Sequence, residues 1–525
     1  MGARRRPAPA DRACRPRYRA PIPAATGRPA VDRRETAPRV TADLRSGFAT
    51  AGELAAAIRE RRLSAVEAHD LYAARIDRLN PPLNAIVIPN PQARDRAIAA
   101  DEALARGESW GPLHGVPVTI KDIFDVRGLR NTAGYAPARD NVSTSNATVV
   151  QRILDAGAVI LGKTNVPLLC YDWQCVSPIF GRTNNPWNLD RTPGGSTGGG
   201  AAALAAGLTP LEIGSDAAGS IRIPAHFCGV FGLKPTEHRV SGAGHGELPG
   251  APPRGLRHMV SFGPLARNVA DLRLALTLLE GPDGRHSEVP PMPPTAPTRE
   301  PPAATELRIA WVDALPHGPV SSETATAMRA AAASLEIAGC SLERVAPADF
   351  DLHDALELWG EINGFEMGVM TPAPIRLLLR HGTYFGLGRT RWTRGLRGGL
   401  ALDPRRFVRA LAARDEMIAG LEQFLARFDA WMLPVSPTAA FPHMRSGKPL
   451  VINGVKVAYT TAVGAYSAPF NLTGNPAVVV PAGQTPDGMP VGVQLVGRRW
   501  DDDALLAVAD RVSQILGPFQ VPPGY

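Results

Sequence analysis

One segment, residues 192–224, constrains this chain more than any other part of it: TPGGSTGGGAAALAAGLTPLEIGSDAAGSIRIP. It contains two glycine-rich stretches, which hold Ser196 and Ser220, and a run of small apolar residues lies between them. Glycine lets the backbone adopt conformations that other residues resist and lets a second group approach closely. The segment therefore predicts two tight turns that each present a serine, with a helix-like spacer and a strand at residues 211–216 between them.

Glycine-rich turns often bind phosphate, but the pattern here does not favour that function. A P-loop requires GxxxxGK[ST], and no lysine follows the glycines of this segment. A dinucleotide-binding GxGxxG motif also fits poorly. In GSDAAGS (214–220), by contrast, successive backbone N–H groups can converge on one point and stabilise an oxyanion. Ser220 is then placed as an acyl-transfer nucleophile, and the competing interpretation is an ordinary Gly-Ser turn.

A nucleophilic serine needs a base, and the sequence offers two kinds. The chain has eleven histidines, but Ser220 lacks the GxSxG context of a nucleophile elbow, so no motif supports a Ser-His-Asp triad. Lys121 ends the apolar stretch VPVTIK and is predicted to be buried. Burial lowers the pKa of a lysine and can leave a neutral amine that accepts a proton. The competing interpretation of Lys121 is a strand-end lysine paired with Asp122.

The net charge of the chain is concentrated at its beginning. Residues 1–40 hold eleven arginines, no lysine and three acidic residues, so this segment carries the whole formal charge of +8. The remaining residues are balanced, and we expect no nucleic-acid partner. We expect residues 1–44 to form a disordered Arg- and Pro-rich extension. It lacks the apolar region of a secretion signal, and both a transit-like segment and an over-extended gene start fit it.

Cysteine content and hydropathy indicate the compartment. No run approaches the roughly 18 consecutive apolar residues that span a bilayer, so we expect no membrane span. The five cysteines are odd in number and form no CxxC pair, which argues against a disulfide framework and against a zinc site. These features predict a cytoplasmic protein without a metal.

Strands alternate with helices along the chain, which predicts an α/β fold around a largely buried sheet. Capping boxes at Thr50 and Ser64 predict two helices within residues 50–80, ended by Asn80-Pro81-Pro82. Residues 282–302 contain eight prolines and are expected to form a linker or surface loop.

A mostly helical segment is predicted over residues 352–430. It carries eight arginines between positions 389 and 414, which indicate either a solvated helical face or a basic patch for an acidic ligand or a membrane surface. Its apolar residues either line a pocket for an apolar or aromatic substrate or belong to the core; they include Leu356, Trp359, Ile362 and Phe365.

Five motifs together resemble the amidase signature enzymes. The resemblance covers about residues 45 to 515, and its longest motifs are specific. The matching stretches are GVPVTIKD (115–122), GRTNNPWN (181–188), RTPGGSTGGGAAALAAG (191–207), GSDAAGSIRIPAHFCGVFGLKPT (214–236) and FNLTGNPAVVVPAG with GMPVGVQLVG (470–497).

The resemblance implies a single α/β/α domain over residues 45–520 with a central mixed sheet and N-terminal helices packed outside. It implies a Ser–cis-Ser–Lys triad in which Ser220 is the nucleophile, Ser196 the bridging serine after a cis peptide bond, and Lys121 the base. The implied oxyanion hole is formed by the N–H groups of Ala217, Ala218, Gly219 and Ser220. The implied substrate contacts are Tyr171, Asp172 and Trp173.

The implied activity is hydrolysis of a small linear carboxylic amide to a carboxylate and ammonia or an amine, with no cofactor or metal and with a homodimer allowed. Aryl-amide, ester and carbamate hydrolysis share the acyl-enzyme route. The amidase-type subunit of a glutaminyl-tRNA amidotransferase and a catalytically dead binding protein also fit the pattern. The chain departs from the family at Thr197, where a second serine is usual, and at Ala218, where a glycine is common, which puts rate and acyl preference in question.

Overall fold

The computed structural model describes residues 44–248, 255–381 and 390–525, and residues 42–525 form one compact unit. The predicted extension, residues 1–44, lies outside the described residues apart from Leu44. Within the described residues, no helix combines the length and the apolar character needed to cross a membrane.

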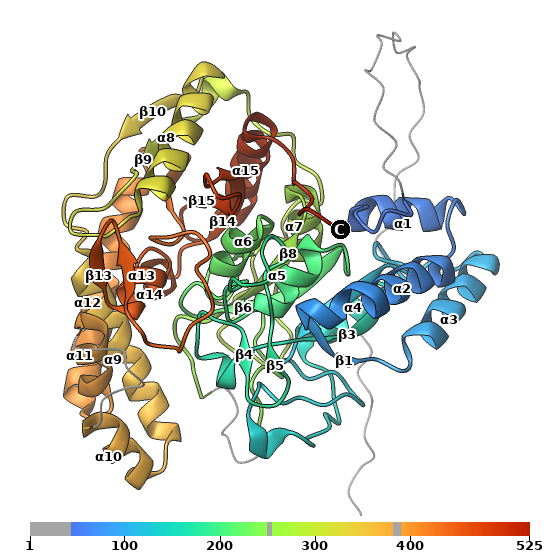
Figure 1. The fold of residues 1–525 in the computed structure, drawn as a ribbon, viewed down its shortest axis with the longest axis horizontal. Coiled ribbons are helices and arrows are strands. Elements are labelled where there is room, and N and C mark those ends of the chain that lie inside the picture. Colours follow the sequence, from blue (N-terminus) through green and yellow to red (C-terminus); the bar gives the residue numbers. More distant parts are fainter. Residues whose placement is uncertain (1–43, 249–254, 382–389) are drawn as a thin grey trace, which may run out of the picture. The chain divides into compact units, whose positions relative to one another are not determined.

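An eleven-stranded sheet runs through the centre of this unit in the order β1-β3-β2-β6-β8-β7-β14-β15-β11-β9-β10 (Figure 1). Strands β3, β2 and β6 pair in parallel, as do β11, β9 and β10, whereas the strands between β6 and β11 pair antiparallel. The predicted mixed sheet is therefore confirmed. Its strands are β1 Ile86–Pro89, β2 Pro117–Lys121, β3 Val159–Thr164, β6 Leu211–Asp216, β7 Phe231–Lys234, β8 Ser261–Ala266, β9 Arg308–Trp311, β10 Ser341–Arg344, β11 Ala430–Pro434, β14 Ala477–Gln484 and β15 Pro490–Val496.

Helices cover both faces of the sheet, and two small hairpins lie outside it (Figure 1). The hairpin strands are β4 Val176–Ser177 with β5 Gly181–Arg182, and β12 Leu450–Ile452 with β13 Val455–Val457. The helices are α1 Ala51–Arg59, α2 Ala65–Leu83, α3 Ala93–Ala105, α4 Thr148–Asp155, α5 Gly198–Ala205, α6 Arg222–Cys228, α7 Val269–Leu279, α8 Ser322–Ile337, α9 Leu352–Met370, α10 Ala373–His381, α11 Arg391–Gly399, α12 Pro404–Leu425, α13 Tyr459–Gly464, α14 Ala468–Leu472 and α15 Asp502–Leu516.

Seven strands of the sheet are buried on both faces, which explains their largely apolar sequences: β2, β3, β6, β7, β8, β11 and β15. Ala430 and Met432 of β11 belong to one hydrophobic cluster, with residues of α7, α8 and α15. Trp431 and Leu433, which point to the opposite face, belong to a second cluster, with residues of α5, α6 and α14. This alternation produces the predicted α/β/α layers.

The N-terminal helices begin as the sequence predicts, but α2 ends later. Thr50 and Ser64 both form complete capping boxes. Helix α2 continues through Pro81 and Pro82 to Leu83 instead of ending at Asn80. The prolines occupy its last turn, and Asn84 ends the helix in the left-handed conformation with its N–H bonded to the Asn80 carbonyl.

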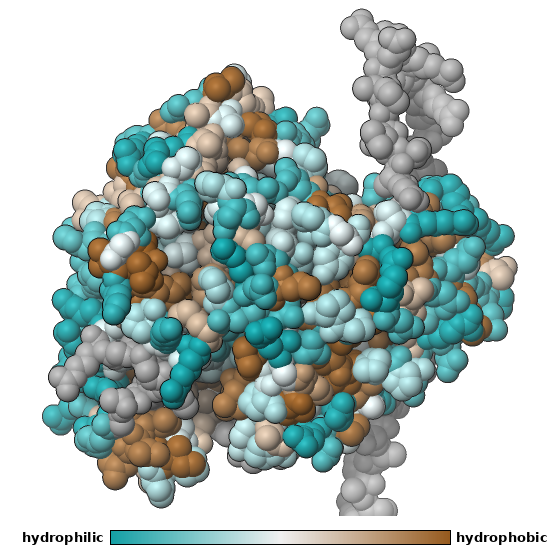
Figure 2. Space-filling view, in the orientation of Figure 1, coloured by the Kyte–Doolittle hydropathy of each residue, from teal (hydrophilic) through white to brown (hydrophobic). Residues whose placement is uncertain are grey.

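The predicted helical segment forms α9 to α12 (Figure 1). Glycines let α9 and α11 approach closely, since a Cβ at Gly360 would lie 2.4 Å from the carbonyl oxygen of Trp392. Helix α10 has no buried residue, and its Leu377 and Leu378 are exposed. An apolar patch is visible at the lower left of Figure 2, on the side where Figure 1 shows α10.

The pairing of β2 with β6 determines where the glycine-rich segment lies. These parallel neighbours end at the same edge of the sheet, with Ile120 opposite Ile213. Lys121 ends β2 and Asp216 ends β6, so the turn after β6 begins beside Lys121. The carboxyl edge of parallel strands is a common location for sites in α/β folds.

Arg75 of α2 links the N-terminal helices to the helix that follows Ser196. Its Nε donates to the carbonyl of Gly207 at 2.8 Å and its Nη2 to that of Ala206 at 2.9 Å, and both carbonyls lie at the end of α5. We predict that Arg75→Leu lowers the free energy of unfolding by about 1–3 kcal/mol, because these carbonyls lose a charged donor. Urea unfolding should show no comparable loss for Arg78→Leu, which changes an exposed arginine of the same helix.

Candidate active site

Lys121 is fully buried and surrounded by oxygen atoms. Its Nζ lies 2.8 Å from Ser196 Oγ, 3.1 Å from the carbonyl oxygen of Ser215 and 3.0 Å from Ser215 Oγ. Burial lowers the pKa of Lys121, while the more distant Asp216 and Glu212 act in the opposite direction. A neutral amine has two N–H donors and one lone pair, so it can donate twice to Ser215 and accept a proton from Ser196.

An ion pair between Lys121 and Asp122, the competing interpretation of this lysine, is not what the structure shows. Asp122 pairs with Lys163 at 2.7 Å, and both side chains are fully buried. It also accepts from the backbone N–H and the hydroxyl of Thr132. Within the described part of the chain, Lys121 forms no ion pair.

Backbone hydrogen bonds hold the stretch around Ser196 against the stretch that carries Ser220. The Gly195–Ser196 peptide bond is cis, as the resemblance implies. The N–H of Thr197 donates to the Ser220 carbonyl at 3.1 Å, and the Thr197 hydroxyl lies 3.4 Å from the carbonyl of Ser215. The threonine in place of a second serine is thus accommodated in a buried position.

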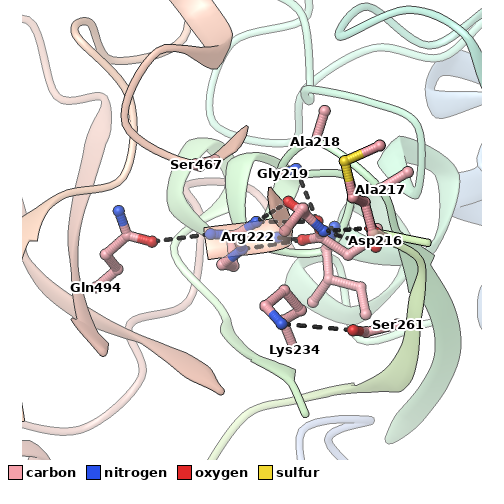
Figure 3. A network of polar contacts seen from close by, with 12 residues as sticks. Asp216, Ala217, Ala218, Gly219, Arg222, Lys234, Ser261, Ser467 and Gln494 are labelled. Atoms are coloured by element: carbon pink, nitrogen blue, oxygen red, sulfur yellow. Dashed lines mark hydrogen bonds and ion pairs between the residues drawn. The ribbon is translucent and has the colours of Figure 1, made fainter. Parts of the chain in front are cut away.

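The turn that carries Ser220 is held by the carboxylate of Asp216 (Figure 3). This carboxylate accepts from the N–H groups of Gly219 at 2.7 Å and Ile221 at 3.0 Å, and it pairs with Arg222 at 3.0 Å. Burial alone would raise the pKa of Asp216, but the charge and hydrogen bonds of Arg222 hold it well below its usual range. Arg222 extends to Gln494 of β15, which anchors the turn to the sheet.

Three N–H groups of the turn are open. Of the described residues, none accepts a hydrogen bond from the N–H of Ala217, Ala218 or Ser220, whereas that of Gly219 is used by Asp216. Gly219 has a φ of +102°, and a Cβ there would lie 2.6 Å from both Ile223 Cδ1 and Ser467 Cβ. Ala218 is outside the positive-φ residues, so its methyl group does not strain the turn.

A cavity of about 140 Å³ opens onto both serines and the turn. Among the described residues no hydrogen bond joins the hydroxyls of Ser196 and Ser220, although both side chains line the cavity. Catalytic hydrogen bonds are often loose before substrate binds.

The structure places all three predicted substrate contacts at this cavity. Tyr171 is 47% exposed and its hydroxyl donates to Asn363. Burial raises the pKa of Asp172, although the hydroxyl of Tyr459 donates to its carboxylate at 2.5 Å. Trp173 is buried, and its indole N–H donates to the Ala218 carbonyl at 3.0 Å, so this side chain contacts the turn itself.

Sequence reasoning did not separate the cavity residues of α9 from its core residues. Trp359 and Asn363 of α9 line the cavity one helical turn apart, with Trp392 of α11 and with His245. Helical spacing marked only the apolar residues of this segment, and two of them, Leu356 and Ile362, belong to the core instead. Only the packing of α9 against α11 distinguishes the two groups.

One group of side chains among the described residues has the composition of a metal site: His238, His286 and Glu288. The Nδ1 of His286 accepts from the N–H of Gly242 at 2.9 Å, so its Nε2 carries the proton and faces Glu288 at 3.3 Å. A metal ligand would need the Nε2 lone pair. This hydrogen bonding favours an imidazole–carboxylate pair over a metal centre.

The fold and the arrangement of these groups define an amide hydrolase, and the comparisons agree. The family model described as Amidase matches residues 67–506. The chain therefore belongs to the amidase family.

Three similar proteins show the range of this family. The chain is 34% identical to an acylamidase of Rhodococcus erythropolis, over 88% of this chain and 94% of that protein. It is 33% identical to a subunit of the glutamyl-tRNA(Gln) amidotransferase of Alkalilimnicola ehrlichii, over 91% and 99%. The structure of 6-aminohexanoate cyclic dimer hydrolase superposes with a TM-score of 0.75 at 28% identity and covers 91% of this chain and 99% of that one.

The backbone conformation of the turn predicts different effects for substitutions at Gly219 and at Ala218. Gly219→Ala places a methyl group at a positive φ and against Ile223 and Ser467, and such strain costs about 1–3 kcal/mol. We predict that kcat/KM for amide hydrolysis falls about 10- to 100-fold. Ala218→Gly, the matched control, should stay within about threefold of the wild type. Full activity in Gly219→Ala would show that the turn does not need this conformation.

Proposed function

We propose that this protein hydrolyses small linear carboxylic amides through an acyl-enzyme on Ser220, as an amidase in the strict sense. The observation that carries the proposal is the contact of 2.8 Å between Ser196 and the buried amine of Lys121. A buried lysine of lowered pKa can act as a base near neutral pH, which a solvated lysine cannot.

The first step of the reaction forms a tetrahedral intermediate on Ser220. Neutral Lys121 accepts the proton of Ser196, and Ser196 accepts the proton of Ser220 as the Ser220 Oγ attacks the amide carbonyl. A C–O bond forms, and the π electrons move to the carbonyl oxygen. The N–H groups of Ala217, Ala218 and Ser220 stabilise this oxyanion, while Gly219 keeps its N–H on Asp216.

The following steps form the acyl-enzyme and release both products. The tetrahedral intermediate collapses, the C–N bond breaks, and the proton returns through Ser196 to the leaving nitrogen, which leaves an ester on Ser220. A water molecule, deprotonated by the same relay, then attacks this ester; the bond between the carbonyl carbon and Ser220 Oγ breaks, the relay returns the proton to Oγ, and the acid leaves as the carboxylate after ionisation.

The aromatic lining of the cavity favours a substrate with an apolar or aromatic acyl group. Trp173, Trp359, Trp392 and Tyr459 form much of its wall. Anilides, esters and carbamates can follow the same acyl-enzyme route. The similarity to an amidotransferase subunit makes glutamine a second candidate substrate, with its ammonia passed to a partner.

We also propose a cytoplasmic location and a homodimer. The four cysteines of the described residues are free thiols, as is usual in a reducing compartment. Light scattering after size-exclusion chromatography would measure the oligomeric state.

The proposal predicts which side chains are indispensable. Ser220→Ala and Lys121→Ala should each lose at least about a thousandfold in kcat, because each removes a member of a relay that acts as a unit. Release of ammonia and carboxylate would be measured with phenylacetamide, acetamide, acetanilide and glutamine. A fluorophosphonate should label the wild type and not Ser220→Ala.

Ser436→Ala is the matched control, because it removes a buried hydroxyl away from the cavity. It should retain wild-type turnover. Turnover by Ser220→Ala at the control's rate would overturn the proposed nucleophile. Turnover of glutamine alone, raised by an added partner, would favour the transferase.

The role of Lys121 gives the pH profile a definite sign. The amine must be neutral to accept a proton, so activity is lost as the pH falls through the pKa of Lys121 and is present above it. Burial places that pKa below the usual 10.5. We predict that kcat/KM rises with pH and levels off below pH 10.5, where an ordinary lysine would titrate. A profile that falls over this range contradicts lysine as the base.

A further inference from the structure

Three consecutive peptide groups of the turn are held from their carbonyl side by side-chain N–H groups. Asn471 Nδ2 donates to the Asp216 carbonyl at 2.9 Å. Trp359 Nε1 donates to the Ala217 carbonyl at 2.9 Å, and Trp173 Nε1 donates to the Ala218 carbonyl at 3.0 Å. The donors come from α14, α9 and the loop before the first serine, which are far apart in the sequence.

These contacts determine the directions of the N–H groups. In a trans peptide the C=O of one residue and the N–H of the next point in opposite directions within one plane. Asn471 therefore directs the N–H of Ala217, and Trp359 directs that of Ala218. Trp173 directs the N–H of Gly219, which Asp216 already holds at 2.7 Å. Of the two indoles, only Trp359 controls an open N–H.

We propose that Trp359 is a positioning residue that aligns the Ala218 N–H with the oxyanion, an inference that rests on the proposed function. The turn consists of small residues, so its Ala217–Ala218 peptide has no bulky side chain of its own to resist rotation. The indole is rigidly placed: Trp359 is 3% exposed, and its ring centroid lies 4.2 Å from that of Trp392. Trp392 in turn packs edge-on against Trp173 at 5.5 Å.

This arrangement gives helix α9 a second role. The helix forms one wall of the cavity through Trp359 and Asn363, and it also holds the peptide group that stabilises the transition state. A change in the wall at Trp359 therefore alters the chemical step as well as substrate binding.

The test removes the indole N–H and keeps the aromatic ring. Trp359→Phe should lower the maximal rate of labelling of Ser220 by a fluorophosphonate, and kcat for phenylacetamide, about 10- to 100-fold. The concentration for half-maximal labelling and KM should change less than about threefold, because ground-state binding does not use the oxyanion. A defect of packing alone would not lower kcat and the labelling rate while leaving KM and the half-maximal concentration nearly unchanged.

Trp187→Phe is the matched control, since it removes an indole N–H that donates at 2.9 Å to the Cys228 carbonyl away from the cavity. It should keep both rates within about twofold of the wild type. If Trp359→Phe unfolds, replacing Trp359 by benzothienylalanine keeps the bicyclic ring and still removes the donor. Rates equal to those of the control would overturn the inference, and a labelled, active Ser220→Ala would instead overturn the proposed function.

Discussion

A buried lysine that has no carboxylate partner among the described residues is the constraint on which the rest of the site depends. Transfer of an unpaired ammonium to an apolar interior is very costly, so burial lowers the pKa of this amine and makes its neutral form easier to reach than in water. Lys121 meets this condition because Asp122, its neighbour in the sequence, is paired with Lys163 on the adjacent strand β3. The oxygens around Nζ then belong to two neutral serines. The Asp122–Lys163 pair thus keeps a negative charge away from the proposed base.

The turn after β6 is held by hydrogen bonds to its N–H groups and to its carbonyl groups, and the two sets of partners differ in charge. On the N–H side, Asp216 binds Gly219 and Ile221 and is itself fixed by Arg222. On the carbonyl side, neutral amide and indole groups bind three successive oxygens. Neutral donors leave the electrostatic potential near the open N–H groups free of an added charge. Preorganised dipoles of this kind stabilise a developing oxyanion without reorganisation during the reaction.

The sequence predicted the parts of this architecture that local patterns encode. Strand β6 coincides with the predicted residues 211–216, and the predicted capping boxes at Thr50 and Ser64 are present. The parallel pairing of β2 with β6, which brings Lys121 to the glycine-rich segment, is a long-range contact that the sequence did not predict. The end of α2 was misplaced because proline is unfavourable in a helix interior yet fits in the last turn of this one. The contact of Trp359 with Ala217 could not be predicted, since an indole N–H has no local sequence signal and this pair is 142 residues apart.

The alanine at position 218 places a methyl group at the cavity without straining the backbone of the turn. Its side chain is buried and lines the cavity. Its carbonyl accepts a hydrogen bond from Trp173, and its N–H remains open. A methyl group there takes up space in the cavity beside the open N–H groups of the turn. Gly219 has no such freedom, because its positive φ and the contact with Ile223 exclude a side chain. The turn therefore tolerates a side chain at 218, whereas its backbone conformation excludes one at 219.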